Sequence, residues 1–308
     1  MKLLITGGTG LIGTELVKRL RERYSITVLS RKPKRAIEHF GKGVHALASL
    51  DEVQNIGDFY GVINLQGEGI ADKRWSERQK LRIQQSRWGI TRQLTELIQQ
   101  SDTPPQVFIS GSAIGYYGDQ GSQTMTEDEV VERPEDFAQQ LCAEWERLAL
   151  AAQSEKTRVC IVRTGVVLAS EGSALQKMLP PYLLGLGGPL GSGKQYFSWI
   201  HLQDMARLLE FLLEQDSCHG IYNATAPEPV PQAEFSETIA KVLRKSHFMR
   251  VPAWTLKLLL GEMSQMLLTG QRVVPARLQQ AGFEFNYPSP AVALRDCLLP
   301  PSSRPQSS

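Results

Sequence analysis

The chain has 308 residues, of which 42% are hydrophobic and 21% are charged. This length is enough to bury a full core, and the composition excludes a disordered, collagenous or fibrous chain. Lys and Arg together number 34 and Asp and Glu number 32, which leaves a net charge of +2. So small an excess of positive charge gives no reason to expect nucleic acid or an acidic membrane as a partner.

Cysteine and histidine spacing predicts a protein with reduced thiols and no metal site. The four cysteines lie far apart and form no C-x-x-C pair, so we expect no disulfide framework and mostly buried thiols. The five histidines show no metal-ligand spacing. The N-terminus lacks the apolar run of a signal peptide, and no segment approaches the ~20 apolar residues that span a bilayer. We therefore expect a cytoplasmic protein that has no membrane partner.

Short apolar runs alternate with helical patterns through the first 165 residues. We predict strands at 2–6, 26–30, 44–48, 61–65, 106–110 and 158–163. Helical spacing predicts helices from about 11 to 20, 74 to 100 and 135 to 152. Continuously apolar strands of this kind are typical of a parallel sheet covered by helices on both faces. The pattern predicts an α/β fold with a doubly wound parallel sheet of the Rossmann type.

The later chain predicts a smaller substrate-side lobe at the C-terminus. Residues 168–200 are rich in glycine and proline and predict an irregular segment on the substrate side, in which we expect 187–197 to form a substrate wall or lid. Helices are predicted at 202–213 and 232–245, with a short strand at 220–224. A last apolar helical face has spacing that suits a core or interface helix: Leu256, Leu259, Leu260, Met263, Met266 and Leu267. The predicted domains are 1–249 for the cofactor, 250–298 as a small helical domain, and 299–308 as a disordered tail.

The strongest motif follows the first predicted strand, where glycines stand at positions 7, 10 and 13 of TGGTGLIG. Gly7 permits a tight turn, Gly10 lets a pyrophosphate approach the backbone, and Gly13 lets the helix pack closely on the sheet. The helix that follows offers unpaired N–H groups and the positive end of its dipole. The alternative is an ordinary glycine-rich turn between a strand and a helix. Because a buried strand precedes the motif and an amphipathic helix follows it, the sequence favours dinucleotide binding.

The end of the second strand predicts which dinucleotide binds. A site for NAD carries an acidic residue here that bonds the ribose hydroxyls, but this chain has Ser30 and Arg31 followed by Lys32, Pro33 and Lys34. A guanidinium matches the geometry of a 2′-phosphate, so the sequence favours NADP(H). The alternative is a solvated basic turn, which suits Lys34 better than Arg31.

These residues resemble the extended short-chain dehydrogenase/reductase superfamily of nucleotide-sugar epimerases and reductases. Asn64-Leu65-Gln66-Gly67 is similar to the N-L-A-G element after its fourth strand, SGSAIGYYG at 110–118 is similar to its serine-bearing segment, and WIHLQD at 199–204 to its late F-I-H-x-x-D element. The longer runs NLQGEGIADKRW, QSRWGIT, RTGVVLA, GLGGPLGSG and GQRVVPARL resemble the atypical "epimerase family" members, which carry a C-terminal domain of unknown function. The resemblance covers most of the chain.

The resemblance implies a cofactor site. The residues it assigns to the cofactor are Gly7, Thr9, Gly10, Leu11, Ile12, Gly13, Ser30, Arg31, Leu65, Gln66, Gly67, Arg87 and Val167. It also implies that a homodimer, if one forms, uses the two long helices at about 74–100 and 135–152.

The chain departs from the family at the catalytic pair. The superfamily uses Tyr-x-x-x-Lys about twenty residues after the serine segment, and the aligned positions here are Phe137 and Leu141. A phenyl ring cannot transfer a proton and leucine carries no charge, so the resemblance does not carry the standard mechanism over.

Several side chains are candidates to replace that pair. Ser112, Tyr116 and Tyr117 are candidate catalytic groups, although each also suits a structural role in backbone bonding or aromatic packing. Arg87 is a candidate to bridge the cofactor and to supply the charge of the missing lysine. Glu68 is a candidate base or substrate contact, although it equally suits a loop carboxylate in water, and Lys194 is a candidate substrate contact. His201 suits a structural role because no acidic partner is visible in the sequence.

Two functions follow from these features. The first is an NADP(H)-dependent oxidoreductase or epimerase of a small polar, sugar-derived substrate, in which Ser112, a nearby tyrosine or water transfers the proton. The second is a catalytically weak NADP(H) sensor or interaction module, and for this the family resemblance offers a link to cell division. Loss of both Tyr and Lys favours the second function, whereas the aromatic, glycine-rich segment favours the first.

Overall fold

The computed structural model describes residues 1–299 and divides the chain into two compact units. The first unit comprises residues 1–116, 133–163 and 205–222. The second comprises residues 117–132, 164–204 and 223–299. The predicted disordered tail at 299–308 lies, apart from Leu299, outside the described residues.

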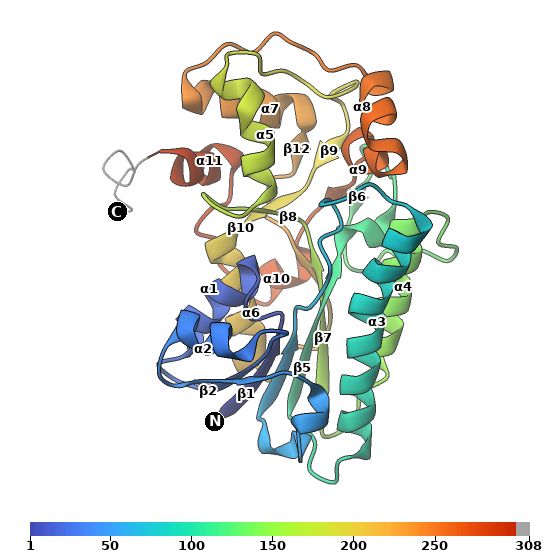
Figure 1. Cartoon of the computed structure of the whole chain (residues 1–308). Coiled ribbons are helices and arrows are strands. Elements are labelled where there is room, and N and C mark those ends of the chain that lie inside the picture. Colours follow the sequence, from blue (N-terminus) through green and yellow to red (C-terminus); the bar gives the residue numbers. More distant parts are fainter. Residues whose placement is uncertain (300–308) are drawn as a thin grey trace. The chain divides into compact units, whose positions relative to one another are not determined.

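A seven-stranded sheet forms the centre of the fold (Figure 1). Its strands, in spatial order, are β11 (Gly220–Ala224), β7 (Arg158–Thr164), β5 (Val107–Ala113), β4 (Gly61–Asn64), β1 (Lys2–Thr6), β2 (Ser25–Leu29) and β3 (Val44–Leu47). β1 is parallel to both of its neighbours, since Leu3 pairs with Ile26 on β2 and with Gly61 on β4. The predicted doubly wound parallel sheet is confirmed.

Helices cover both faces of this sheet (Figure 1). The helices of this layer are α1 (Leu11–Leu20), α2 (Pro33–Phe40), α3 (Glu77–Gln100), α4 (Phe137–Leu150) and α6 (Leu202–Glu214). The two longest, α3 and α4, pack against one another on one face. Side chains fix where both begin: Ser76 accepts a hydrogen bond from the Gln79 N–H, and Asp136 forms a capping box with Gln139. Buried Leu4, Val62, Leu94, Phe108 and Ile161 belong to the core between sheet and helices.

The second unit holds shorter elements around its own core. Its strands are β6 (Thr124–Met125), β8 (Val166–Leu168), β9 (Tyr196–Phe197), β10 (Trp199–His201), β12 (Val230–Pro231) and β13 (Arg272–Val273). Its helices are α5 (Ala174–Leu183), α7 (Gln232–Leu243), α8 (Ala253–Leu260), α9 (Gln265–Leu268), α10 (Ala276–Gln280) and α11 (Pro290–Leu298). Three two-stranded pairings, β8 with β10, β9 with β12 and β6 with β13, tie these stretches together.

The prediction of an irregular segment at 168–200 is wrong in part, because α5 lies inside it. Pro180 and Pro181 stand within that helix, in its second half, where each removes only one backbone donor. Leu175 and Tyr182 are buried on its inner face and anchor the helix despite the prolines. Glycine and proline content alone therefore did not predict the helix α5.

The apolar stretch near residue 260 is not a single core helix. Gly261, at φ +61°, ends α8, and a 3₁₀ turn at Gly261–Ser264 leads into α9. Leu256 and Met263 are buried as predicted, but Leu259 and Met266 are exposed at 62% and 43%. Among residues 1–299, no helix combines the length and the apolar character needed to cross a bilayer.

All four cysteines are buried, as the sequence predicted. Burial raises the pKa of Cys142 to about 12 and that of Cys160 to about 12. Since the thiolate is the reactive form, we predict that iodoacetamide at pH 8 alkylates these two cysteines only after the protein is unfolded in urea. Peptide mass spectrometry tests this, and alkylation of Cys142 or Cys160 in the native protein would contradict it.

Candidate functional site

The turn between β1 and α1 requires glycine at two positions for close approach. Gly7 has φ +67°, and a Cβ there would lie 2.7 Å from the main-chain carbonyl of Leu65. A Cβ on Gly13 would lie 2.3 Å from the carbonyl oxygen of Gly7. Gly7 thus packs against the main chain that follows β4, and Gly13 packs against the main chain of the turn, so neither position has room for a side chain. The fold brings Gly7 and Leu65, two predicted cofactor residues, together.

The first turn of α1 is suited to bind an anion. Gly10 is the N-cap and supplies no side-chain hydrogen bond, and the first turn contains no acidic residue. The N–H groups of Leu11, Ile12 and Gly13 lie at a helix N-terminus, where intrahelical acceptors are lacking and the dipole is positive. A Cβ on Gly10 would approach only the Gly7 carbonyl oxygen, at 3.2 Å, so the backbone is otherwise uncovered there. This cradle fits the pyrophosphate of a dinucleotide.

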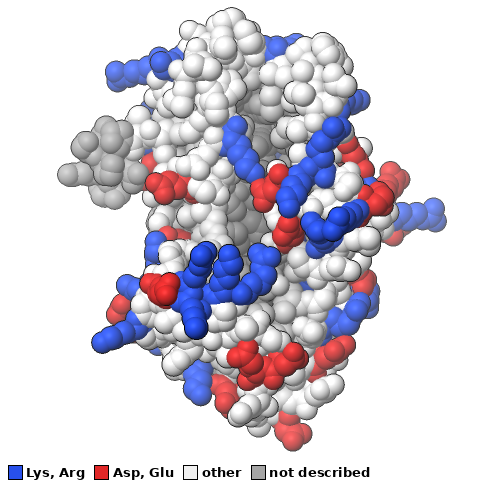
Figure 2. Space-filling model, viewed as in Figure 1, with Lys and Arg blue, Asp and Glu red and all other residues white. Residues whose placement is uncertain are grey.

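The end of β2 is basic and exposed. Arg31 lies on the surface, and within residues 1–299 no acidic side chain forms an ion pair with it. The Ser30 hydroxyl accepts a hydrogen bond from the Lys32 N–H at 3.2 Å. Lys and Arg atoms gather near α1 and α2 on the face shown in Figure 2. The positive charge around this strand end suits the 2′-phosphate of NADP better than the uncharged 2′-hydroxyl of NAD.

Arg87 of α3 reaches back to the loop after β4. Its Nη1 donates to the main-chain oxygen of Glu68 at 3.0 Å, and a Cβ on Gly67 would lie 2.7 Å from its Cζ. The guanidinium also lies over the Trp145 ring, 5.2 Å from the centroid. Desolvation lowers the pKa of Arg87. The Glu68 N–H donates to Ser86 Oγ at 2.9 Å, so this loop is held by two adjacent helix residues.

Ser112 belongs to a buried polar network. Its hydroxyl donates to Glu146 Oε1 of α4 at 2.6 Å. Arg163 of β7 donates to both oxygens of the same carboxylate, at 2.9 and 2.8 Å. The Arg163 guanidinium also stacks on Tyr116, 3.5 Å from the ring centroid. Ser112, Glu146, Arg163 and Tyr116 are all buried.

Apolar packing replaces the superfamily's catalytic pair. Phe137 and Leu141 are buried at the start of α4 with Ile83. Trp75 packs edge-on against the Phe137 ring, with centroids 5.0 Å apart. These positions therefore stabilise the contact between α3 and α4 and hold no titratable group.

Thr9 and Gln66 lie in the first unit, and Tyr117, Val167 and Lys194 lie in the second. The Tyr117 hydroxyl is within 2.8 Å of the Thr126 carbonyl oxygen and 2.8 Å of Asn223 Oδ1, so protein atoms surround it. Val167 lies in β8 opposite Ile200 of β10. Lys194 is exposed, and its main-chain N–H donates to Ser192 Oγ.

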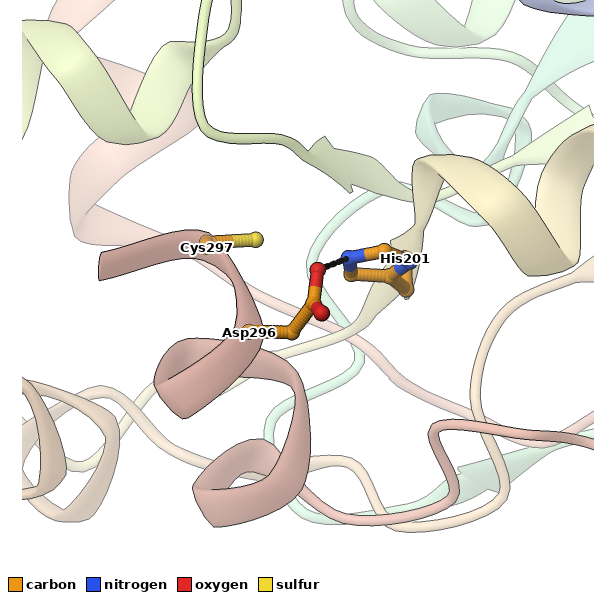
Figure 3. A group of neighbouring side chains, drawn as sticks. All are labelled: His201, Asp296 and Cys297. Carbon is orange, nitrogen blue, oxygen red and sulfur yellow. Dashed lines mark ion pairs between the residues drawn. The ribbon is translucent and has the colours of Figure 1, made fainter. Parts of the chain in front are cut away.

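His201 has an acidic partner that the sequence did not reveal. Its Nε2 lies 3.2 Å from Asp296 of α11, while its Nδ1 accepts the Gln203 N–H at 3.2 Å (Figure 3). With Nδ1 as the acceptor, the ring proton is on Nε2, between the ring and the carboxylate. Cys297 completes a group whose ligand atoms lie within 4.8 Å of one another. A metal there would have to displace the Nε2 proton, so the hydrogen bond from Nε2 to the Asp296 carboxylate by itself accounts for the arrangement.

Sequence reasoning missed Glu146 and Arg163. A signal was present, since Glu146 stands on the same helical face as Cys142 and Ala149, which are four residues before it and three residues after it. Arg163 similarly ends a strand of buried apolar residues. A charged residue in each of two buried elements is a sign of a buried pair, because neither charge is stable alone in a core.

Two family models match the chain. The NAD dependent epimerase/dehydratase family model matches residues 3–225, and a domain of unknown function (DUF1731) matches residues 251–297. The first match covers well over half of the chain, and the cofactor turn and the seven-stranded sheet lie within it. The fold and the site thus define a Rossmann-type, nicotinamide-cofactor-binding protein. The chain belongs to the NAD dependent epimerase/dehydratase family.

Named relatives agree with this assignment. "Epimerase family protein SDR39U1 homolog, chloroplastic" of Arabidopsis thaliana is 39% identical over 302 residues, covering 96% of this chain and 86% of that protein. "Epimerase family protein SSP1921" of Staphylococcus saprophyticus is 39% identical over 295 residues, covering 95% of this chain and 98% of that protein. The crystal structure of human epimerase family protein SDR39U1 (isoform 2) with NADPH superposes with a TM-score of 0.88 at 34% identity, covering 96% of this chain and 99% of that chain.

Proposed function

We propose that this protein is an NADP(H)-dependent oxidoreductase or epimerase that acts on a small polar metabolite such as a sugar derivative. The observation that carries the proposal is the uncapped, glycine-lined N-terminus of α1 beside a strand end that holds Arg31 and no acid. The NADPH complex of the human relative supports the choice of cofactor. Location in the cytoplasm and dimerisation through α3 and α4 stay predictions of the sequence.

The chain's own groups would divide the work of holding the cofactor. The main chain at Gly10–Gly13 binds the pyrophosphate, and Arg31 with Ser30 binds the 2′-phosphate. Arg87, held near Gly67, supplies the positive charge that the missing lysine would have given on the nicotinamide side. When bound, the nicotinamide supplies hydride transfer.

Ser112 and Glu146 would accept the proton that the substrate hydroxyl loses on oxidation. Because the Ser112 hydrogen is donated to Glu146, the serine oxygen can still accept a hydrogen bond from a substrate hydroxyl. In the oxidative direction that hydroxyl proton moves to Ser112 Oγ while the serine proton moves to Glu146 Oε1, so the site gains the one proton that the substrate loses. Arg163 holds the Glu146 carboxylate in place through hydrogen bonds to both of its oxygens. Tyr116 orients Arg163 through its ring, and Tyr117 stabilises the surrounding loop.

Charge reversal at Arg31 tests the cofactor preference. We expect Arg31→Glu to weaken NADPH binding by about 10- to 100-fold, because it removes a charge-assisted bond and adds repulsion, while NADH affinity changes little. Arg35→Glu, an exposed charge on α2, is the matched control and should leave both affinities near wild type. Fluorescence titration with each cofactor gives both values. Equal losses for NADPH and NADH in Arg31→Glu would contradict the role of Arg31.

Turnover tests the enzyme assignment. Purified protein is incubated with NADPH and a panel of small ketones, aldehydes and keto-sugars while absorbance at the NADPH band is followed. We expect oxidation of NADPH with at least one polar carbonyl compound, and loss of that activity in Ser112→Ala. NADPH binding without turnover across the panel would instead favour the sensor or interaction module.

A further inference from the structure

One end of the second unit exposes an unusual share of large apolar side chains. Within residues 1–299, fifteen large hydrophobic residues are exposed, and nine of them lie in the two segments 177–186 and 244–268. These nine are Leu183, Leu184, Leu186, Phe248, Met249, Trp254, Leu258, Leu259 and Met266. Several stand well out of the surface: Leu184 is 75% exposed, Leu258 70% and Trp254 68%. Isolated exposed hydrophobics are ordinary, but a group of this size marks an interaction surface.

Main-chain hydrogen bonds hold the segment 244–268 against residues 187–191, which directly follow the segment 177–186. The N–H groups of Phe248 and Met249 donate to the Gly187 carbonyl oxygen at 2.9 and 3.1 Å, and Val251 exchanges bonds with Pro189 and Gly191. In Figure 1 the chain between α7 and α8 crosses the end of the unit at which α5 finishes. We call the exposed side chains of 177–186 and 244–268 the basic apolar surface.

The charges on this surface are almost all positive. Its exposed charged residues are Lys177, Arg244, Lys245, Arg250, Lys257 and Glu262. Five cations against one acid give a local charge of +4, although the whole chain carries only +2. In Figure 2, blue and white atoms, without red, occupy the end of this unit that carries the chain between α7 and α8. Positive and negative charges nearly balance over the whole chain, so the net charge alone concealed this asymmetry and offered no reason to expect an acidic membrane as a partner.

We propose that the basic apolar surface docks the protein peripherally on an anionic lipid bilayer. Leucine, phenylalanine and tryptophan side chains that protrude singly can enter the boundary between headgroups and acyl chains, with Trp254 at the depth that indole rings favour. The surrounding lysines and arginines then lie at the level of the lipid phosphates, and their long stems can reach that level from a partly inserted backbone. Docking of this kind needs no membrane-spanning helix.

A second copy of the chain fits the basic apolar surface less well than an anionic bilayer does. A two-fold contact would place this surface against itself and bring five cations toward five cations with only one acid on each side. An acidic protein partner fits the charge, but it would be expected to bind in the absence of lipid. The proposal does not depend on the enzymatic function, because none of these residues belongs to the cofactor cradle.

Vesicle flotation tests the proposal with the full chain. Vesicles of phosphatidylcholine with 30% phosphatidylserine are compared with pure phosphatidylcholine vesicles at low and high NaCl. We expect the protein to float with the anionic vesicles, to stay behind with the neutral ones, and to be released by high salt. Failure to float with anionic vesicles, or equal flotation with neutral ones, overturns the proposal.

Paired variants locate the surface. The double variant Trp254→Ser/Arg250→Glu should lower partition onto anionic vesicles at least tenfold. The control variant Val130→Ser/Lys42→Glu changes one exposed apolar and one exposed basic residue outside this surface, and it should bind like wild type. Unchanged thermal midpoint and NADPH affinity show that each variant folds, and a failed cofactor proposal would appear there without affecting flotation. Wild-type binding by the Trp254/Arg250 variant overturns the proposal, as does lipid-independent dimerisation that this variant abolishes.

Discussion

Glu146→Gln should cost this protein about 3 to 5 kcal/mol of unfolding free energy, the usual penalty for leaving one member of a buried ion pair without its partner. The amide can still accept from Ser112, but it no longer neutralises the Arg163 guanidinium, which is 1% exposed and bonded to both carboxylate oxygens. Arg163→Met should lower the unfolding free energy by a similar amount, because it leaves the buried Glu146 carboxylate without a positive partner. Urea unfolding, followed by circular dichroism, measures both.

The same helix provides a matched control. Arg147 donates to both carboxylate oxygens of Glu144 at 2.7 and 2.8 Å, but on the protein surface. Solvent screens this pair, so Glu144→Gln should change stability far less than Glu146→Gln. The combined Glu146→Leu and Arg163→Met variant should recover most of the lost stability, since apolar groups can replace a buried pair without leaving a lone charge. If Glu146→Gln and Glu144→Gln unfold at the same urea concentration, the buried network does not stabilise the fold as described.

Gly10→Ala should weaken NADPH binding about 100-fold with little change in stability. Its Cβ would approach only the Gly7 carbonyl oxygen, at 3.2 Å, so the fold can adjust by a few tenths of an ångström. The same methyl group would stand in the cradle and separate the phosphate from main-chain donors, at the loss of one or two charge-assisted hydrogen bonds of about 1.5–3 kcal/mol each. Cofactor titration and urea unfolding separate the two effects.

Two other glycines act as controls for that substitution. Gly13→Ala would bring a Cβ to 2.3 Å from the Gly7 carbonyl oxygen, so it should destabilise the fold as well as the cofactor site. Gly89 lies inside α3 with nothing within 4 Å of an added Cβ, so Gly89→Ala should stabilise the protein by about 0.5–1 kcal/mol and leave NADPH affinity unchanged. An unaltered NADPH affinity in Gly10→Ala would contradict the pyrophosphate cradle.

The sheet was predictable because its strands are local apolar runs, and the glycine turn because its spacing reflects local backbone geometry. The same local reasoning misplaced α5, where two prolines are tolerated because Leu175 and Tyr182 anchor the helix in the core. The local pattern does not show which distant residues pair: His201 meets Asp296 across 95 positions of sequence, and Ser112 meets Glu146 across 34. The candidate site was therefore predictable where main chain forms it, and much less so where side chains from different elements meet.

Isothermal titration of the purified chain with NADPH tests the central claim most directly. The account predicts saturable heat for one site per chain, tighter binding of NADPH than of NADH, and loss of this difference in Arg31→Glu. No heat with NADPH at protein concentrations well above the micromolar range would mean that the β1–α1 turn does not bind a dinucleotide, and the proposed function would be wrong.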